Sequence, residues 1–251
     1  MLLRRIAKSG KAAAQRLGLD IARYPFSLPG HRRDLILRAI GVDLVVDVGA
    51  NIGQYGQQLR RFGYQGSIIS LEPLSEPFAA LQAAAARDGN WRAINRAAGE
   101  SNEEITVNVA GNSISSSILP MLDRHATVAP KSRFERTETA VMERLDTLLG
   151  DELRRFRRPF LKIDTQGFER PVLAGAENVM SHIAGIEMEM SLVPLYQGQM
   201  LFREALSLMD EKGFWLAGLA TGFWDDRTGE MLQVDGIFLA AEYRDGLRVP
   251  V

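Results

Sequence analysis

VVDVGANIGQ, residues 45–54, is the stretch that decides the fold of this 251-residue chain. Its apolar run, broken only by Asp47, is typical of a central parallel strand that is buried on both faces. The run stops at Gly49, after which we expect Asn51 to be the N-cap of a helix and Gln54 to complete a capping box. A strand, a glycine turn and a helix in this order predict a doubly wound α/β fold.

The spacing of the glycines argues against a nicotinamide dinucleotide as the ligand of this turn. A nicotinamide-binding turn needs G-x-G-x-x-G for the pyrophosphate, whereas this chain has Asp47-x-Gly49-x-x-x-Gly53. Glycines at these positions carry no Cβ that would obstruct a ligand near the main chain. The next apolar run, residues 67–71, ends in Glu72, about 20 residues on, where a nucleotide-binding unit places its ribose-binding carboxylate. The cofactor-binding residues predicted from these two turns are Asp47, Gly49, Asn51, Gly53 and Glu72.

Length and composition are those of a single large α/β domain, with 46% hydrophobic residues. The absence of cysteine excludes disulfide bonds, thiolate nucleophiles and cysteine-based metal centres. His31, His125 and His182 are far apart in the sequence and lack H-x-x-x-H spacing, so the sequence predicts no metal site.

The first forty residues are strongly basic. They contain nine Lys or Arg and two Asp, a formal charge of +7, although the whole chain has a net charge of −1. We therefore predict a basic, helical N-terminal extension, residues 1–41, ahead of a cofactor-binding domain, residues 42–251. Its first helix either packs across the domain, which we favour, or contacts an anionic membrane or lipid-linked substrate. No apolar stretch approaches the ~20 residues of a membrane span or resembles a signal peptide, so we expect a cytoplasmic protein.

Periodicity predicts the remaining elements. Strands are expected at residues 91–95, 105–109, 160–163, 186–191, 214–219 and 233–240, and helices at 31–40, 78–87 and 202–211. The last two strands, joined through a turn at 226–229, are expected to form an antiparallel hairpin that closes the sheet. The serine-rich stretch at 111–120 is either a flexible loop without a chemical role or a source of ligand contacts. Further cofactor candidates are Asn95, Ser115 and Ser116.

A second strand-turn-helix unit, PFLKIDTQGFERPVLAGAE, covers residues 159–177. Lys162 and Asp164 lie on one side of its strand by period two. Because ligands in open α/β sheets bind beyond the carboxyl ends of the strands, we expect Asp164 to face the same crevice as Gly49 and Glu72. The alternative is that Lys162 and Asp164 form a buried ion pair and nothing more. In the following IEMEMS strand, residues 186–191, the acidic side chains face either solvent or the crevice.

Four motifs occur in the same order as in a known family. VVDVGANIGQY, LKIDTQGFERPVLAGAE, EMEMSLVPLYQGQ and VDGIFL together resemble the FkbM-type methyltransferase family over roughly residues 42–240. The resemblance implies a Rossmann-like class I methyltransferase fold, with a seven-stranded, mostly parallel sheet, an antiparallel last strand and helices on both faces. It also implies S-adenosyl-L-methionine as the methyl donor and O-methylation of a sugar, glycan, polyketide or similar metabolite. The acceptor itself is not fixed by these motifs.

The chemistry of such a transfer requires alignment of the acceptor oxygen and removal of its proton. Asp164, oriented by Lys162, is our first candidate for the base; Glu189, which matches the family's acid in its strand, is second, and His125 and His182 follow. A divalent metal held by the two carboxylates is an alternative, although the ligand set is incomplete.

Two other functions stay open at this point: a nicotinamide-dependent reductase, and a non-catalytic module that binds a cofactor or a membrane. For the enzyme we expect a small-molecule or glycan acceptor and no nucleic-acid partner.

Overall fold

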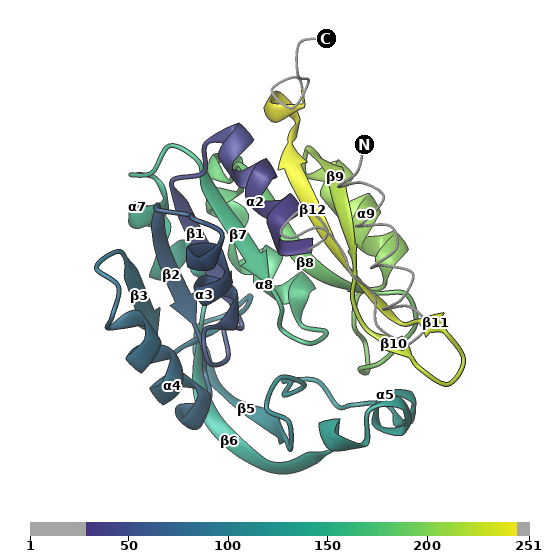
Figure 1. Ribbon diagram of the computed structural model, residues 1–251. Helices are drawn as coiled ribbons and strands as arrows, with labels where there is room; N and C mark the ends of the chain where they lie inside the picture. The colour runs from purple at the N-terminus through teal and green to yellow at the C-terminus, as the bar shows by residue number, and fades with distance from the viewer. Residues whose placement is uncertain (1–28, 245–251) are drawn as a thin grey trace, which may run out of the picture.

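A seven-stranded sheet forms the centre of the protein (Figure 1). The structure is a computed structural model in which residues 29–244 are described; the basic helix expected near the N-terminus lies outside these residues. In spatial order the strands are β3 (Trp91–Ile94), β2 (Ser67–Leu71), β1 (Leu44–Val48), β7 (Pro159–Ile163), β8 (Gly185–Ser191), β12 (Gln233–Ala240) and β9 (Phe214–Thr221).

The register of the sheet brings the ends of its central strands level. Val48 at the end of β1 is opposite Leu71 of β2 and Ile163 of β7, and both pairings are parallel. The residues that follow, Gly49, Glu72 and Asp164, therefore leave the sheet at one edge, as expected. Strand β12 runs antiparallel to both β8 and β9. The predicted seven-stranded, mostly parallel sheet with an antiparallel last strand is confirmed.

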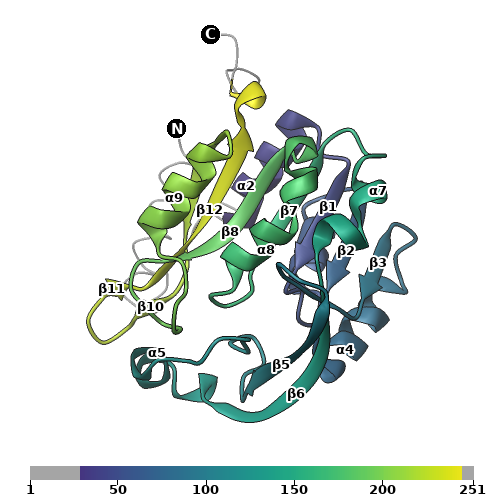
Figure 2. The same ribbon diagram turned by 180° about the vertical axis from the view of Figure 1, so that it is seen from behind.

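Helices cover both faces of the sheet, as the sequence predicts (Figures 1 and 2). Val45 packs into one core, whereas its neighbours Leu44 and Val46 pack into the core on the other face. Within residues 29–244 no helix is long and apolar enough to cross a membrane. The first face carries α2 (Pro29–Ile40), α3 (Gln54–Arg61) and α4 (Ser75–Ala85); the second carries α6 (Leu145–Leu148), α7 (Gly150–Leu153), α8 (Glu169–Gly175) and α9 (Phe202–Glu211).

Helix α2 shares the core of the domain, although the sequence assigns it to the N-terminal extension. Its Leu37 and Ile40 are buried in the same cluster as Val45 of β1 and Phe160 of β7. The boundary that we predict near Gly41 therefore separates α2 from residues with which it packs. A separate N-terminal extension would have to end before α2.

A second, three-stranded sheet lies beyond the carboxyl edge of the central sheet, at the bottom of Figure 1. It consists of β4 (Ala97–Ala98), β6 (Phe134–Glu143) and β5 (Glu103–Ala110), and α5 (Asp123–Val128) follows the serine-rich loop. The sequence predicts neither β6 nor α5. In β6, five of the ten residues are exposed, so the apolar alternation that marks a strand is weak. The last connection is a small hairpin of β10 (Trp224–Asp225) and β11 (Glu230–Met231), which confirms the predicted turn at 226–229.

The capping box predicted at Asn51 is wrong. Helix α3 begins at Gln54, its N-cap is Gly53 with a φ of 87°, and no side chain caps it. Asn51 lies ahead of the helix in the left-handed region, with a φ of 47°, and its backbone N–H donates to Glu72 Oε2 at 2.8 Å. The helix starts later than expected because this turn is bound to the end of β2. Helix α4, in contrast, begins three residues earlier than predicted, at Ser75.

Close packing against protein atoms explains the two glycines of the first turn. Gly49 has a φ of 74°, and a Cβ added to it would lie 1.9 Å from the backbone oxygen of Asp164. A Cβ on Gly53 would lie 3.0 Å from Leu81 Cδ1 and 3.1 Å from the Trp91 ring. The sequence reading gives clearance for a ligand as the reason for both glycines; in the structure, each also makes room for a neighbouring segment of the chain.

We predict that Gly49→Ala destabilises the protein by about 2–4 kcal/mol, since it combines a left-handed backbone with a steric overlap against main-chain atoms. Urea denaturation of the two proteins measures this difference. Gly89→Ala is the matched control, because a Cβ at Gly89 has no atom within 4 Å. Equal stability of the two variants would show that the two turns move apart freely.

Candidate active site

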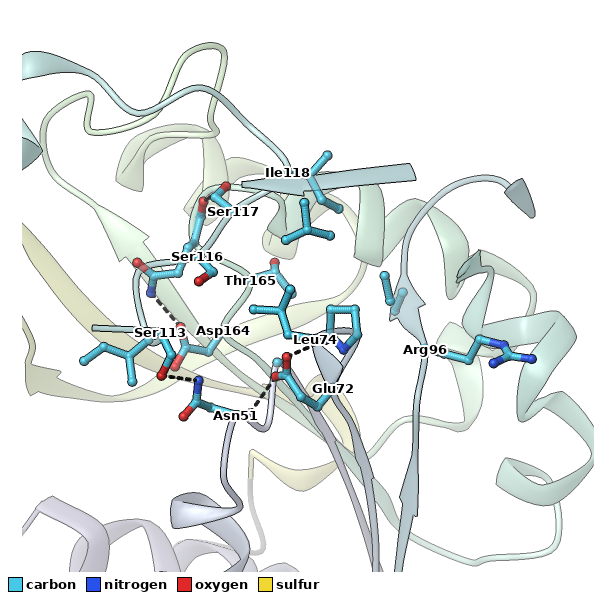
Figure 3. A pocket seen from close by; sticks show the side chains of 17 residues that line it. Asn51, Glu72, Leu74, Arg96, Ser113, Ser116, Ser117, Ile118, Asp164 and Thr165 are labelled. Atoms are coloured by element: carbon cyan, nitrogen blue, oxygen red, sulfur yellow. Dashed lines mark hydrogen bonds between the residues drawn. The ribbon is translucent and has the colours of Figure 1, made fainter. Parts of the chain in front are cut away.

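Glu72 occupies the end of β2 as a buried carboxylate, with 5% of its surface exposed. Oε2 accepts from the Asn51 N–H at 2.8 Å and Oε1 accepts from the Leu74 N–H at 3.0 Å (Figure 3). Burial raises the pKa of Glu72 to about 7, despite these two hydrogen bonds, which act in the opposite direction. The side chain is thus fixed in place, and it lines a cavity at the carboxyl edge of the sheet.

This cavity includes residues that the sequence predicts to bind the methyl donor, so we call it the donor cavity; besides Glu72 and its neighbours, two turns and a loop line it. Gly49 and Asn51 contribute from the first turn, Asp164 and Thr165 from the turn after β7, and residues 113–114 and 116–118 from the serine-rich loop (Figure 3). The Asn51 Nδ2 amide donates to Ser113 Oγ at 3.2 Å and so joins the first turn to the loop. Two turns of the central sheet and an inserted loop therefore meet around one space.

The other predicted cofactor residues have varied positions. Asn95 Nδ2 donates to the backbone oxygens of Glu72 at 2.9 Å and Pro73 at 3.0 Å, and so holds the chain after β2. Ser116 lines the donor cavity, with its Oγ accepting from the Ala110 N–H. Ser115 lines a different cavity and accepts from the Asn112 side chain. Neither Asn95 nor Ser115 reaches the donor cavity.

Asp47 and Lys162 form a buried ion pair below the two turns. Lys162 Nζ lies 3.0 Å from Asp47 Oδ1, donates to the Gly49 backbone oxygen at 3.1 Å, and lies 3.5 Å from Asp164 Oδ2. The Asp47 side chain is fully buried, and Ser70 Oγ donates to its Oδ2. Burial opposes the positive charge of Lys162, but Asp47 and then Asp164 outweigh it, so the pKa of Lys162 is raised. The predicted pairing of Lys162 with Asp164 exists, with Asp47 as the nearer partner.

Asp164 is the most accessible carboxylate of the group, with 40% of its side chain exposed. Its Oδ1 accepts from Gln166 Nε2 at 2.8 Å, and the same amide nitrogen donates to Glu189 Oε2 at 2.8 Å. Asp164 lines the donor cavity and two further cavities on either side of it. The two predicted catalytic carboxylates are thus brought together through one glutamine.

Besides the two carboxylates, two hydroxyl groups hold Gln166. Its backbone is in the left-handed region, with a φ of 52°, and its backbone oxygen accepts from Ser117 Oγ at 2.7 Å. The Tyr196 hydroxyl donates to Gln166 Oε1 at 2.9 Å, which fixes the orientation of the amide. The next acid, Glu169, secures the turn by accepting from the backbone N–H groups of Thr165 at 3.2 Å and Gly167 at 3.0 Å.

Glu189 is more enclosed than Asp164. Gln233 Nε2 donates to Glu189 Oε2 at 2.6 Å, in addition to Gln166. Burial, and next the negative charge of Asp164, raise the pKa of Glu189 well above its ordinary value. Its environment therefore favours the protonated form.

A cavity on the other side of Asp164 includes residues that the sequence reading does not assign to the site. The Arg33 guanidinium of α2 lies 4.2 Å from the ring centre of Tyr55, and Lys162 Nζ lies 5.3 Å from the same centre. The Tyr55 hydroxyl donates to Glu187 Oε2 at 2.6 Å, and Arg33 Nη1 lies 3.6 Å from Glu187 Oε1. Strand β8 thus turns Glu187 toward this cavity, and Glu189 lines it as well. Of the two alternatives given for these acidic side chains, the structure shows the crevice and not solvent.

The two candidate histidines have different environments. His182 is exposed and lies beside Ser181 at the amino-terminal side of β8, whereas His125 is buried and lines a cavity together with Asp164 and Glu189. Among residues 29–244, no group of three or more His, Asp or Glu residues is arranged to hold a metal ion.

Comparison with known proteins assigns the family. Residues 47–216 match the methyltransferase FkbM domain, which is more than half of the chain. The protein is a member of the FkbM methyltransferase family. The resemblance described from the four sequence motifs is therefore confirmed, and the matched region includes Asp47, Glu72, Lys162, Asp164 and Glu189.

Solved structures similar to this FkbM-family chain are distant. A putative RNA methyltransferase of Pyrococcus horikoshii is 11% identical, with a TM-score of 0.45 and coverage of 84% of this chain and 83% of that one. Magnesium protoporphyrin IX methyltransferase of Synechocystis PCC 6803, with bound SAM, is 8% identical (TM-score 0.46; coverage 84% and 77%). The methyltransferase domain of bacterial CtHen1 is 8% identical (TM-score 0.46; coverage 84% and 96%). A search of curated proteins gave no match.

We predict that Lys162→Met destabilises the protein by roughly 3–5 kcal/mol, because it leaves Asp47 buried without a compensating charge. Urea denaturation provides the measurement, and the double variant Asp47→Asn, Lys162→Met should recover part of the loss. Lys212→Met is the control, since Lys212 pairs with the exposed Glu177 and should cost less than about 1 kcal/mol. Equal losses for the two lysine variants would contradict the importance of the buried pair.

Proposed function

We propose that this FkbM-family methyltransferase uses S-adenosyl-L-methionine to methylate a hydroxyl oxygen of a small molecule or glycan, such as a sugar, a polyketide or a similar metabolite. The observation that carries the proposal is the position of Asp164. It is a half-exposed carboxylate where the donor cavity meets the two neighbouring cavities, with one oxygen held by Gln166 and the other near Lys162.

The residues of the donor cavity fit the cofactor. Each Glu72 oxygen uses one hydrogen bond to the backbone and keeps a second lone pair that can accept from a ribose hydroxyl. The Asn51 turn, Ser116 and Thr165 supply further polar groups around the same space. When bound, S-adenosyl-L-methionine supplies a methyl group on a positively charged sulfur, which needs no further activation by the protein.

The remaining task of the protein is to remove the proton of the acceptor hydroxyl, and Asp164 is suited to it. Its exposure allows contact with an acceptor, and its Oδ2 is kept in place 3.5 Å from the Lys162 ammonium. Glu189 lies 2.8 Å from the same Gln166 amide, but its enclosed environment favours the proton-bound form. Glu189 therefore positions Gln166, and Asp164 accepts the proton.

The alternatives have less support. A nicotinamide-dependent reductase lacks its phosphate-binding motif here, and the family match is to methyltransferases. A non-catalytic module would not need an accessible carboxylate between three cavities. The sequence also offers contact between a predicted basic N-terminal helix and an anionic membrane. The residues of that prediction lie outside the described residues 29–244. With a net charge of −1, we do not propose a nucleic-acid acceptor.

The experiment that tests oxygen as the target uses S-adenosylmethionine with a deuterated methyl group. The full-length protein is incubated with an extract of metabolites and glycans, and mass spectrometry locates the labelled product. A label that survives strong alkali and is attached to oxygen in the fragmentation spectrum supports a methyl ether. A label on nitrogen or carbon, or one released as methanol, would overturn the proposal.

We predict that Asp164→Asn lowers turnover by about 10²–10⁴-fold, because the amide keeps the shape but cannot accept the proton. Affinity for S-adenosylmethionine, measured by calorimetry, should stay unchanged, and stability should fall by less than about 1 kcal/mol because Asp47 still compensates Lys162. Asp151→Asn, which changes an exposed carboxylate, is the control. A large loss of stability with a proportionate loss of activity would assign Asp164 a structural role.

We predict that the affinity for S-adenosylmethionine falls as the pH is lowered below about 7, by up to about tenfold per pH unit. Only the ionised form of Glu72 accepts from both ribose hydroxyls while keeping both backbone hydrogen bonds, so full binding releases the proton that the free carboxyl, with its pKa of about 7, carries in acid. Glu72→Ala should weaken binding by roughly 1.5–3 kcal/mol at pH 8 and lose this pH dependence. Titrations of the ligand itself affect both proteins alike. Parallel pH curves for the two proteins would place Glu72 outside the binding site.

A further inference from the structure

The cavity that contains His125 lies on the loop side of Asp164, and we call it the α5 cavity. Its lining combines the turn after β7, strand β8, helix α5 and the segment before β10, and it reaches both Asp164 and Glu189. The sequence reading ranks His125 last among the candidate bases, but the fold brings it into the same space as the two leading candidates.

His125 is a buried imidazole with an unsatisfied nitrogen. His125 is 3% exposed, and its Nδ1 has no hydrogen-bond partner among the described residues. The ring is fixed by an edge contact with Tyr196, at 5.1 Å between centroids, and a tilted contact with Phe223 at 5.6 Å. Burial lowers the pKa of His125 to about 4, so the ring is neutral near pH 7 and carries one donor and one acceptor. Buried polar groups without a partner are rare, and the residue that carries this one is part of the lining of the α5 cavity.

The charges around the α5 cavity select against anions. Its lining residues, all within the described part of the chain, include two carboxyl groups and neither Lys nor Arg. The cation beneath them, Lys162, already has Asp47, Asp164 and the Gly49 oxygen as partners. A negatively charged ligand would lose its hydration here and face Asp164 without gaining a free cation.

We propose that the α5 cavity is the acceptor subsite and that it takes an uncharged, hydroxylated ring with an apolar face. The apolar face lies against Phe223, and a hydroxyl next to the methylated one pairs with His125. Gln54, whose side chain is exposed at the rim, is available to a further hydroxyl. The proposal rests on the proposed function, since it assigns Asp164 as the base at the inner end of this subsite.

Ligand-observed saturation-transfer NMR with the full chain tests this without knowledge of the acceptor. The uncharged probe is methyl β-D-glucopyranoside, and the charged probe is its 6-carboxylate counterpart, which differs only in that group. The variants are His125→Phe, which keeps an aromatic ring beside Tyr196, and Phe223→Ser. Their controls are Thr127→Val, an exposed residue of the same helix, and Trp224→Ser, the exposed neighbour of Phe223.

We expect the uncharged probe to bind at least about tenfold more tightly than the charged one. His125→Phe should weaken its binding by roughly three- to tenfold, and Phe223→Ser by about tenfold, with S-adenosylmethionine affinity unchanged. The control variants should bind like the wild type.

Three results would overturn the subsite: no saturation transfer to the uncharged probe, equal or tighter binding of the charged probe, or loss of binding no greater in the two variants than in their controls. If His125→Phe does not fold, the comparison of Phe223→Ser with Trp224→Ser decides. Binding of S-adenosylmethionine, measured on the same samples, separates a failure of this subsite from a failure of the methyltransferase proposal.

Discussion

The buried ammonium of Lys162 is the contact on which both halves of the site depend. It joins β1 to β7 through Asp47, donates to the Gly49 carbonyl oxygen at 3.1 Å, and lies 3.5 Å from Asp164. An ammonium in this position is stable only when its charge and its hydrogens are compensated. The partners that compensate it are the end of the first strand, the glycine turn and the proposed base. Stability of the sheet centre and placement of the proposed base therefore follow from one interaction.

The close approach of the two turns transmits this constraint outward. Because Gly49 leaves room for the Asp164 carbonyl, the chain after β7 can turn directly over the first motif. Gln166 then takes a left-handed conformation and connects Asp164, Glu189, Ser117 and Tyr196. The serine-rich loop is thereby tied to the central sheet. The sequence alone does not decide whether this loop is flexible or functional. In the structure, residues far from it in the sequence hold it over the donor cavity by hydrogen bonds.

Much of the fold could be predicted because the central strands are short, apolar and end in glycine or acid. The level placement of Gly49, Glu72 and Asp164 follows from the parallel register alone. In contrast, the bridging by Gln166 depends on a backbone conformation that its residue type does not specify. The capping role assigned to Asn51 failed for a related reason, since a distant carboxylate competes for its backbone N–H. Strand β6 is too polar to show a periodic signal, and Arg33 reaches Glu187 only because α2 packs on the sheet.

The donor side and the proposed acceptor side of the site differ in how far apart their residues lie in the sequence. This difference explains why the family motifs identify the donor better than the acceptor. The donor side comes mainly from the two strand-turn-helix units, whose residues are local to their motifs. The proposed acceptor side comes from α5, β8 and the segment before β10, and α2 lines a neighbouring cavity; these elements meet only in the folded chain. Substitutions at Arg33, His125 or Phe223 leave both motifs intact while changing the shape and charge of the space beside Asp164. On the proposed function, members of one family can therefore keep the same methyl donor and base while the segments around them select different acceptors.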